Sequence, residues 1–274
     1  MARVARKIRQ SVDLTTIVNH NVKETDAQVD RRIAERFDVL DVLSQACVNG
    51  DSRALIVSGG PGLGKSYNVE KILAQHDNTG ATFSIVKGYT RPTGIVKLLY
   101  QHRAAGNIIV FDDADSVFND DVSLNLLKAV CDTTERRVVS WLSEGKLVDE
   151  DTAEIVPRSF VFEGSVIFIT NLDFDYLIER GHKLAPHLEA LVSRAHYLDL
   201  TLKTKRDYLV RIRQVVEQGL LSDLDVEAQA DVLTFIEAYS DNMRELSLRA
   251  VIKLGNLRRT NTNWERIAKI TMCK

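Results

Sequence analysis

The sequence lacks the features that mark disulfide-bonded, membrane or disordered proteins. Its three cysteines lie far apart, without a Cys-x-x-Cys pair or a Cys/His cluster, so neither a disulfide framework nor a zinc site is encoded. Proline occurs only four times. No apolar run approaches the ~20 residues that span a bilayer, and the basic N-terminus lacks the apolar core of a signal peptide. We therefore expect a cytoplasmic protein with no membrane partner.

The composition is that of a globular protein, but the charge is unevenly distributed. Of the 274 residues 45% are hydrophobic and 27% charged, with a net charge of −2. The first 24 residues carry five bases against two acids, and residues 253–274 carry six bases against one acid. Such basic ends suit nucleic acid phosphates, or they pair with acids of the chain itself or of a neighbouring subunit. The sequence leaves both alternatives open.

Five β-branched apolar runs alternate with helical patterns, which predicts an α/β fold. The runs occupy residues 54–59, 82–87, 107–113, 165–171 and 196–202. Continuous apolar runs suit strands that are buried on both faces of a parallel sheet with helical crossovers. Beyond residue 202 only helical spacing remains. We divide the chain into a basic extension (1–27), an α/β nucleotide-binding core (28–202) and a small all-helical lid (203–274).

A complete phosphate-binding motif follows the first predicted strand. Residues 59–66 read Gly-Gly-Pro-Gly-Leu-Gly-Lys-Ser and fit G-x-x-x-x-G-K-[ST], directly before a helical pattern. In this motif backbone N–H groups surround the phosphates, the lysine contacts the β/γ oxygens and the serine hydroxyl ligates Mg²⁺. An ordinary glycine-rich turn needs no Lys-Ser pair. The residues expected to bind ATP are Gly60, Pro61, Gly62, Leu63, Gly64, Lys65, Ser66 and Tyr67.

Two acids and an amide end the next buried strands. Asp112 and Asp113 close the run 107–113 at its carboxyl end, where open α/β sheets bind ligands. We expect Asp112 to hold Mg²⁺ with Ser66, and Asp113 to orient the attacking water. The alternative is a solvated acidic turn that caps the next helix. Asn171 ends the run 165–171 and either contacts the γ-phosphate or the water, or closes a turn.

Together these motifs resemble the AAA+ ATPase superfamily from about residue 28 to the end of the chain. Lys65 and Ser66 match Walker A, Asp112 and Asp113 match Walker B, and Asn171 matches sensor 1. The resemblance implies a five-stranded parallel sheet of order 5-1-4-3-2, a nucleotide between core and lid, and a ring, usually a hexamer. The family's second Walker B acid is generally Glu, so Asp113 puts fast hydrolysis in doubt.

Two arginines complete the resemblance. Arg194, before the last strand, looks like the arginine finger, which acts on the nucleotide of a neighbouring subunit, and Arg244 in the lid looks like sensor 2. Arg194 is otherwise a surface cation at a helix end. Arg249 lies close to Arg244 and is its alternative. The format also resembles compact AAA+ proteins of tailed bacteriophages.

Two further segments are candidates for contact with a macromolecule. Residues 136–163 alternate like a β-hairpin inserted before the Asn171 strand, as in one branch of AAA+ motors. In the loop 87–91, Tyr89 is placed to grip a polypeptide or stack on a base, and Arg91 to touch phosphate. A half-buried turn before Pro92 is the alternative.

These observations favour a Mg²⁺-dependent ATPase ring that remodels DNA, RNA or a nucleoprotein. A second hypothesis is a remodeller that threads a protein substrate past Tyr89, alone or through an adaptor. A third is a nucleotide-gated scaffold with weak hydrolysis, or a small-molecule P-loop kinase. A kinase is disfavoured because it needs neither a helical lid nor an arginine supplied across an interface.

Overall fold

A computed structural model describes residues 24–143, 145–149 and 153–274. The first 23 residues, which carry most of the predicted basic extension, lie outside the described residues. Among the described residues, no helix has both the length and the apolar character that crossing a bilayer requires. The first half of the described chain contains α2 (Asp26–Asn49), β1 (Ala54–Ser58), α3 (Lys65–His76), β2 (Phe83–Lys87), α4 (Pro92–Gln101), β3 (Ile108–Asp112), the 3-10 helix η2 (Asp115–Phe118) and α5 (Asp121–Cys131).

The second half adds a hairpin, the last two sheet strands and the C-terminal helices. The elements are β4 (Val138–Ser140), β5 (Leu147–Val148), β6 (Ile155–Val156), β7 (Ser159–Val161), β8 (Ser165–Thr170), α6 (Phe174–Glu179), α7 (Ala185–Val192), β9 (His196–Asp199), α8 (Lys205–Glu217), α9 (Val226–Tyr239), α10 (Leu248–Thr260) and α11 (Trp264–Met272).

The five predicted strands form one parallel sheet in the order β2-β3-β8-β1-β9. Numbered along the chain, this is the order 5-1-4-3-2 that the AAA+ resemblance implies, so the predicted fold class is confirmed. Every residue of the central strands β1, β3 and β8 is buried, as continuous apolar runs predict. The last strand is shorter than predicted. It ends at Asp199, whose side chain accepts a hydrogen bond from the Thr201 N–H and turns the chain.

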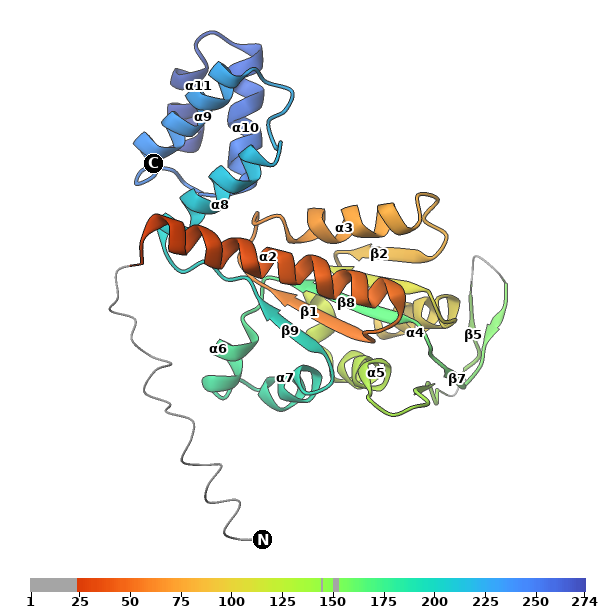
Figure 1. The fold of residues 1–274 in the computed structure, drawn as a ribbon. Helices are drawn as coiled ribbons and strands as arrows, with labels where there is room; N and C mark the ends of the chain where they lie inside the picture. Colours follow the sequence, from red (N-terminus) through yellow and green to blue (C-terminus); the bar gives the residue numbers. More distant parts are fainter. Residues whose placement is uncertain (1–23, 144, 150–152) are drawn as a thin grey trace, which may run out of the picture.

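Helices cover both faces of the sheet (Figure 1). On one face α2 and α3 pack on alternate strand residues such as Leu55 and Val57, and on the other face α4, α5 and α7 pack on residues such as Ile56 and Phe111. This alternation follows from the period of two in a strand. The sheet therefore has two separate apolar cores, one on each side.

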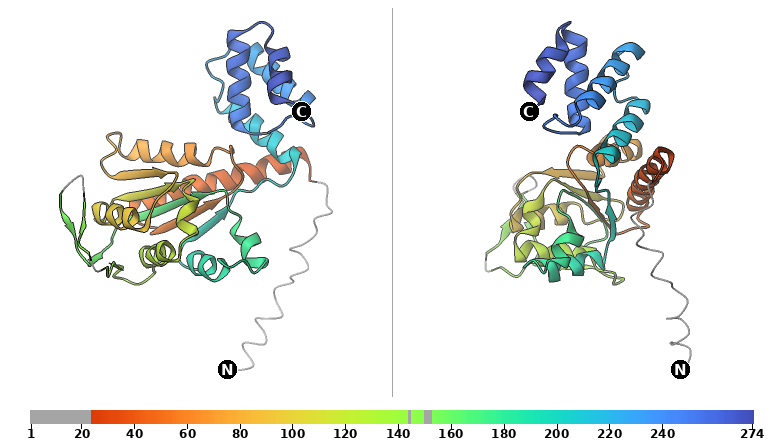
Figure 2. Two further views of the ribbon diagram at one scale, coloured as in Figure 1. Left: turned by 180° about the vertical axis from the view of Figure 1, so that it is seen from behind. Right: turned by 90° about the vertical axis from the view of Figure 1, so that its left-hand side faces the viewer.

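The C-terminal helices α8 to α11 form a third apolar core of their own. They stand clear of the sheet layers and meet the rest of the protein through α8 and α10 (Figure 2). We call this helical unit, residues 203–274, the lid.

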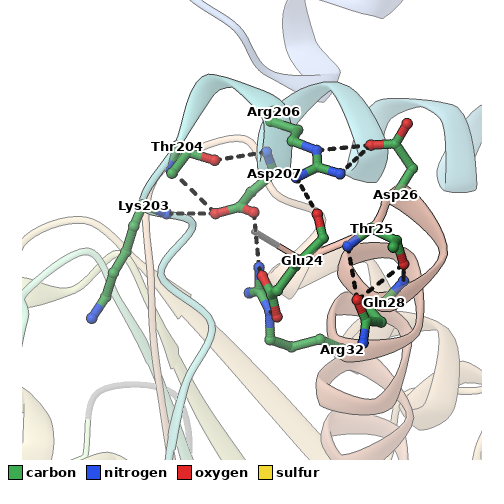
Figure 3. A network of polar contacts seen from close by, with 9 residues as sticks. All are labelled: Glu24, Thr25, Asp26, Gln28, Arg32, Lys203, Thr204, Arg206 and Asp207. Carbon is green, nitrogen blue, oxygen red and sulfur yellow. Dashed lines mark hydrogen bonds and ion pairs between the residues drawn. The ribbon is translucent and has the colours of Figure 1, made fainter. Parts of the chain in front are cut away.

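Charged side chains connect the start of α2 to the start of α8 (Figure 3). Arg32 donates to Glu24 at 2.9 Å and to Asp207 at 3.0 Å, and the Glu24 contact raises the pKa of Arg32. Burial pushes the pKa of Asp207 upward, but the Arg32 contact and backbone N–H groups outweigh burial and lower it. A second ion pair joins Arg206 to Asp26. The lid is thus held to the core by paired charges at its first turn.

The inserted segment 136–163 forms the predicted hairpin. β4 pairs antiparallel with β7, and β5 pairs antiparallel with β6. Arg137 and Val139 are buried while Val138 and Ser140 are exposed, which is the predicted alternation. Residues 144 and 150–152, in the distal part of the insertion, lie outside the described residues.

Candidate nucleotide-binding site

The glycine-rich loop after β1 leads directly into α3. Gly62 and Gly64 have φ angles of 71° and 94°, in the left-handed region that favours glycine. A Cβ atom on Gly62 would lie 2.6 Å from the Cβ of Ser247 in the lid, so the loop also needs glycine for close packing. No side chain caps α3. Its first N–H groups are therefore available to an anion at the helix start.

Lys65 is the buried cation of this loop. Its side chain is only 5% exposed, and Nζ donates to the carbonyl oxygens of Gly59 at 2.7 Å and Gly60 at 2.9 Å. It also donates to Oδ1 of Asn171 at 3.1 Å. Burial lowers the pKa of Lys65 to about 8, although nearby aspartates including Asp113 favour its charged form. The ammonium thus faces the end of the neighbouring strand, as the phosphate-site hypothesis requires.

Ser66 and Asp112 are in direct contact. The Ser66 hydroxyl donates to Oδ1 of Asp112 at 2.7 Å, and the other carboxylate oxygen lies 3.3 Å from Nζ of Lys87. Asp112 is 4% exposed. A hydroxyl and a carboxylate are hard oxygen ligands of the kind that Mg²⁺ takes together with substrate phosphates. The donor set therefore fits this ion.

Asp113 and Asn171 face each other at the carboxyl ends of β3 and β8. Nδ2 of Asn171 donates to Oδ1 of Asp113 at 2.8 Å. Asp113 has a φ angle of 51°, a conformation that aspartate tolerates better than most residues. Its N–H still donates to the carbonyl of Ile169 at 3.0 Å. Lys65, Asn171 and Asp113 therefore form one continuous series of contacts beside the loop.

Asp115 belongs to the same cluster, which sequence reasoning missed. The alternative of an acidic turn that caps the next helix does not describe Asp115, because the side chain of Asp120 caps α5 and no side chain caps η2. Instead Oδ1 of Asp115 accepts the Thr170 hydroxyl at 2.5 Å. Burial raises the pKa of Asp115, and the Thr170 contact opposes that rise. Asp115 thereby anchors the end of β8, next to Asn171.

A cavity of about 650 Å³ opens beside these residues, between core and lid. Its walls come from the glycine-rich loop, α2, α3 and the lid, and they include Asp113 and Asn171. The sequence did not predict that α2 contributes to this cavity. The guanidinium of Arg211, in α8, lies over the ring of Phe37, in α2, at 3.3 Å from the ring centroid. Arg211 is 3% exposed, and burial lowers its pKa to about 10. Sequence spacing gives no sign of this stacked pair.

The lid arginines occupy different places. Arg249 lines the cavity, and its charge acts to lower the pKa of Lys65. Arg244 is not among the residues that line it, and its Nε donates to the carbonyl of Cys273 at 3.1 Å. Of the two sensor 2 alternatives, Arg249 is therefore the one near the phosphate loop.

The remaining predicted contacts lie away from the cavity. Arg194 follows α7, where it donates to the carbonyl of Ala190 at 2.7 Å. The register Leu55 to His196 places it at the amino ends of the strands, opposite the phosphate loop. Tyr89 is 77% exposed, unlike the half-buried residue of the turn alternative, and Arg91 is the N-cap residue of α4.

No protein-family model matches the chain. A protein of Enterobacteria phage T4, described as an uncharacterized 36.7 kDa protein in the nrdC-mobD intergenic region, is 36% identical over 255 residues, which cover 90% of this chain and 76% of that protein. The chain belongs to the family of this phage protein. The resemblance to phage proteins is therefore confirmed.

Solved structures share the fold at low sequence identity. NtrX from Brucella abortus, in complex with ADP, matches with a TM-score of 0.51 and 16% identity over 99% of this chain. The match spans only 56% of that longer chain. The RuvB branch migration motor of Thermotoga maritima matches with a TM-score of 0.48 and 16% identity, over 86% of this chain and 68% of that one. The fold is that of the AAA+ P-loop ATPases.

Proposed function

We propose that the protein is a Mg²⁺-dependent AAA+ ATPase. The observation that carries this proposal is the series of contacts from Lys65 through Asn171 to Asp113, beside a glycine-rich loop that opens a helix. In P-loop enzymes a cation and polar side chains of this kind surround the γ-phosphate and its attacking water, which supports the proposal. The fold shared with NtrX, whose structure contains ADP, supports nucleotide as the ligand.

Each side chain has a distinct role in this proposal. Lys65 contacts the β/γ oxygens, and the nearby aspartates favour its charged form. Asp113 accepts a hydrogen bond from the attacking water, and Asn171 holds the carboxylate of Asp113 in place. Ser66 and Asp112 would hold Mg²⁺, which neutralises phosphate charge. Arg249 brings a lid cation to the same cavity.

The proposed active unit is a ring, usually a hexamer in this superfamily. Arg194 lies at the opposite edge of the sheet from Lys65, so it does not serve the nucleotide of its own subunit. Such a cation acts on the nucleotide of a neighbour. A closed ring of head-to-tail contacts gives every subunit one loop and one arginine.

The proposed substrate is a nucleic acid or a nucleoprotein. Support comes from the basic N-terminal segment of the sequence. The C-terminal bases support it less, because three of them pair within the lid: Arg258 with Asp231, Arg259 with Asp223, and Lys269 with Glu265. The self-pairing alternative therefore accounts for half of that group.

The three free cysteines suit a reducing compartment such as the cytoplasm.

A protein remodeller is the second candidate, and the exposure of Tyr89 favours it. A tyrosine that is 77% exposed, in the loop after β2, can grip a polypeptide as readily as a base. A nucleotide-gated scaffold remains the interpretation if assembly depends on ATP but turnover is very slow.

ATP hydrolysis by the full chain tests the proposal. We expect Mg²⁺-dependent turnover in the wild type, loss of nucleotide binding in Lys65→Ala, and retained binding without turnover in Asp113→Asn. Asp113→Glu restores the longer family residue and should keep or raise turnover. Normal hydrolysis by Asp113→Asn would show that Asp113 is not the residue that orients the water.

The same assay separates the substrates. Stimulation of turnover by single-stranded DNA or RNA supports the nucleic acid proposal, whereas stimulation by an unfolded protein that is lost in Tyr89→Ala supports the protein remodeller. If no nucleotide binds, the ATPase proposal is wrong for either substrate.

A further inference from the structure

A second cavity, of about 480 Å³, lies at the opposite edge of the sheet from the glycine-rich loop. Arg53, directly before β1, and Ser165, the first residue of β8, contribute to it. The loop that binds phosphate follows the other end of β1. The two cavities are therefore separated by the length of a five-residue strand, roughly 15 Å.

Three arginines line this cavity, Arg53, Arg136 and Arg137. The guanidinium of Arg53 donates to the backbone carbonyl oxygens of Asp132 and Thr134, which are neutral acceptors. Arg137 is the buried member of the three, because only 5% of its surface is exposed. It donates to the carbonyl oxygens of Val130 at 2.7 Å and Gly164 at 2.8 Å. Both acceptors are neutral, so the buried positive charge gains hydrogen bonds from them but no opposite charge.

The charges near Arg137 make the burial of its guanidinium energetically unfavourable. Burial, together with the positive charge of Arg53, lowers the pKa of Arg137 to about 10. Among the described residues, no carboxylate forms an ion pair with Arg53, Arg136 or Arg137. Glu135 and Glu163 also line the cavity. Both are exposed, so water weakens their attraction to the arginines without removing it, and the negative charge of Glu163 acts to raise the pKa of Arg137.

An anion in the cavity would offset this cost. A charge-assisted hydrogen bond to a buried guanidinium is stronger than one made in water, since the local dielectric is low. Guanidinium groups fit phosphate oxygens in pairs. Three guanidinium groups can donate hydrogen bonds to more oxygen atoms than the two of a carboxylate. The volume lies within the range of small-molecule sites, ~300 to 1,000 Å³.

We propose that this cavity is a second ligand site, which binds the phosphoryl group of a small phosphorylated molecule through Arg53, Arg136 and Arg137. The ligand is either an inorganic polyphosphate or a mononucleotide, since both present the same oxygens. This site is independent of ATP hydrolysis at the glycine-rich loop.

Calorimetric titration of the full chain with pyrophosphate and, separately, with AMP tests the proposal. The titration uses the Lys65→Ala background, so that the glycine-rich loop does not compete, and circular dichroism verifies the fold. We expect one site with a dissociation constant of about 1 mM or tighter. Binding of pyrophosphate alone points to inorganic polyphosphate, and tighter binding of AMP points to a nucleotide.

Arg136→Gln is the decisive variant, because Arg136 is exposed and its loss leaves the fold intact. It should weaken binding about tenfold or more, the worth of one charge-assisted hydrogen bond. Glu163→Gln should strengthen binding a few-fold by removing a negative charge. Arg180→Gln, which removes an arginine stacked on Tyr176 outside the cavity, is the matched control.

Several results would overturn the proposal. One such result is that neither probe binds at ~10 mM, a concentration beyond the weak end of specific sites. Another is that Arg180→Gln weakens binding as much as Arg136→Gln does, which would indicate a diffuse charge effect. Binding of a single-stranded oligonucleotide that requires Arg136, without binding of either small probe, would also overturn it and assign the cavity to nucleic acid. If Lys65→Ala does not fold, comparing the number of pyrophosphate sites in wild type and Arg136→Gln gives the same answer.

Discussion

The contact between Thr170 and Asp115 should stabilise the fold in a pH-dependent manner. Thr170→Val removes the hydroxyl donor, 2.5 Å from the carboxylate, and keeps the shape of the side chain. A hydrogen bond to a charged group contributes about 1.5 to 3 kcal/mol. We therefore expect the free energy of unfolding to fall by about this amount at pH 7, measured by urea denaturation.

The sign of the pH dependence follows from the raised pKa of Asp115. Burial raises the pKa of Asp115 in the folded state above its unfolded value, so ionisation costs stability once the pH exceeds the unfolded value. The Thr170 hydroxyl reduces this cost. Below the unfolded pKa the carboxyl is neutral in both states, and the loss caused by Thr170→Val should shrink.

Catalysis should respond to the same change. Thr170 is followed by Asn171, which contacts both Lys65 and Asp113, so loosening this turn displaces the amide. Turnover should fall while the nucleotide dissociation constant changes little. Thr170→Ser, which keeps the hydroxyl, is the control and should resemble the wild type. An unchanged free energy of unfolding for Thr170→Val at pH 7 would refute the reasoning.

Three further predictions concern the lid, the interface and the core–lid junction. Arg249→Ala should reduce turnover more than Arg244→Ala, because only Arg249 lines the cavity; equal losses in an ATPase assay would reject this assignment. Arg194→Ala should lose about 10³-fold or more in turnover, and mixing it with Lys65→Ala should restore activity if subunits share sites. Asp207→Asn should lower the free energy of unfolding at pH 7 by about 1 to 3 kcal/mol. That loss should vanish as the pH falls below the lowered folded pKa of Asp207, because its stabilisation is present only above that range.

The sheet was predictable because its strands are buried on both faces. Residues 108–111 and 166–169 are apolar at every position, and each run ends in a polar residue. Uninterrupted apolar runs of this length are typical of strands buried on both faces of a parallel sheet. The motif residues were predictable for a related reason. Phosphate binding requires fixed residue types at fixed spacing, so the local sequence is enough to predict roles for Lys65 and Ser66.

Contacts between distant segments were not predictable from spacing. In the sequence, Phe37 is an ordinary apolar position on a helix and Arg211 an ordinary charged residue. In the folded chain the guanidinium carbon of Arg211 lies 3.3 Å from the ring centroid of Phe37. The contact between Asp115 and Thr170 joins residues that are 55 positions apart, and an aspartate before a helix indicates a cap rather than such a contact. The choice between Arg244 and Arg249 depended on where α10 begins. Ser247 caps that helix and places Arg249 in its first turn, facing the cavity.

The lid and the glycine-rich loop are coupled through the backbone itself. The N–H of Leu248, the first residue of α10, donates to the carbonyl of Gly62 at 2.9 Å, and Gly62 packs against Ser247. The position of the start of α10 therefore depends on the conformation of the glycine-rich loop. The ion pairs between α2 and α8 hold the other end of the lid, at Asp207. The lid therefore has two separate attachments to the core, one at the glycine-rich loop through Leu248 and one at the start of α2 through Asp207.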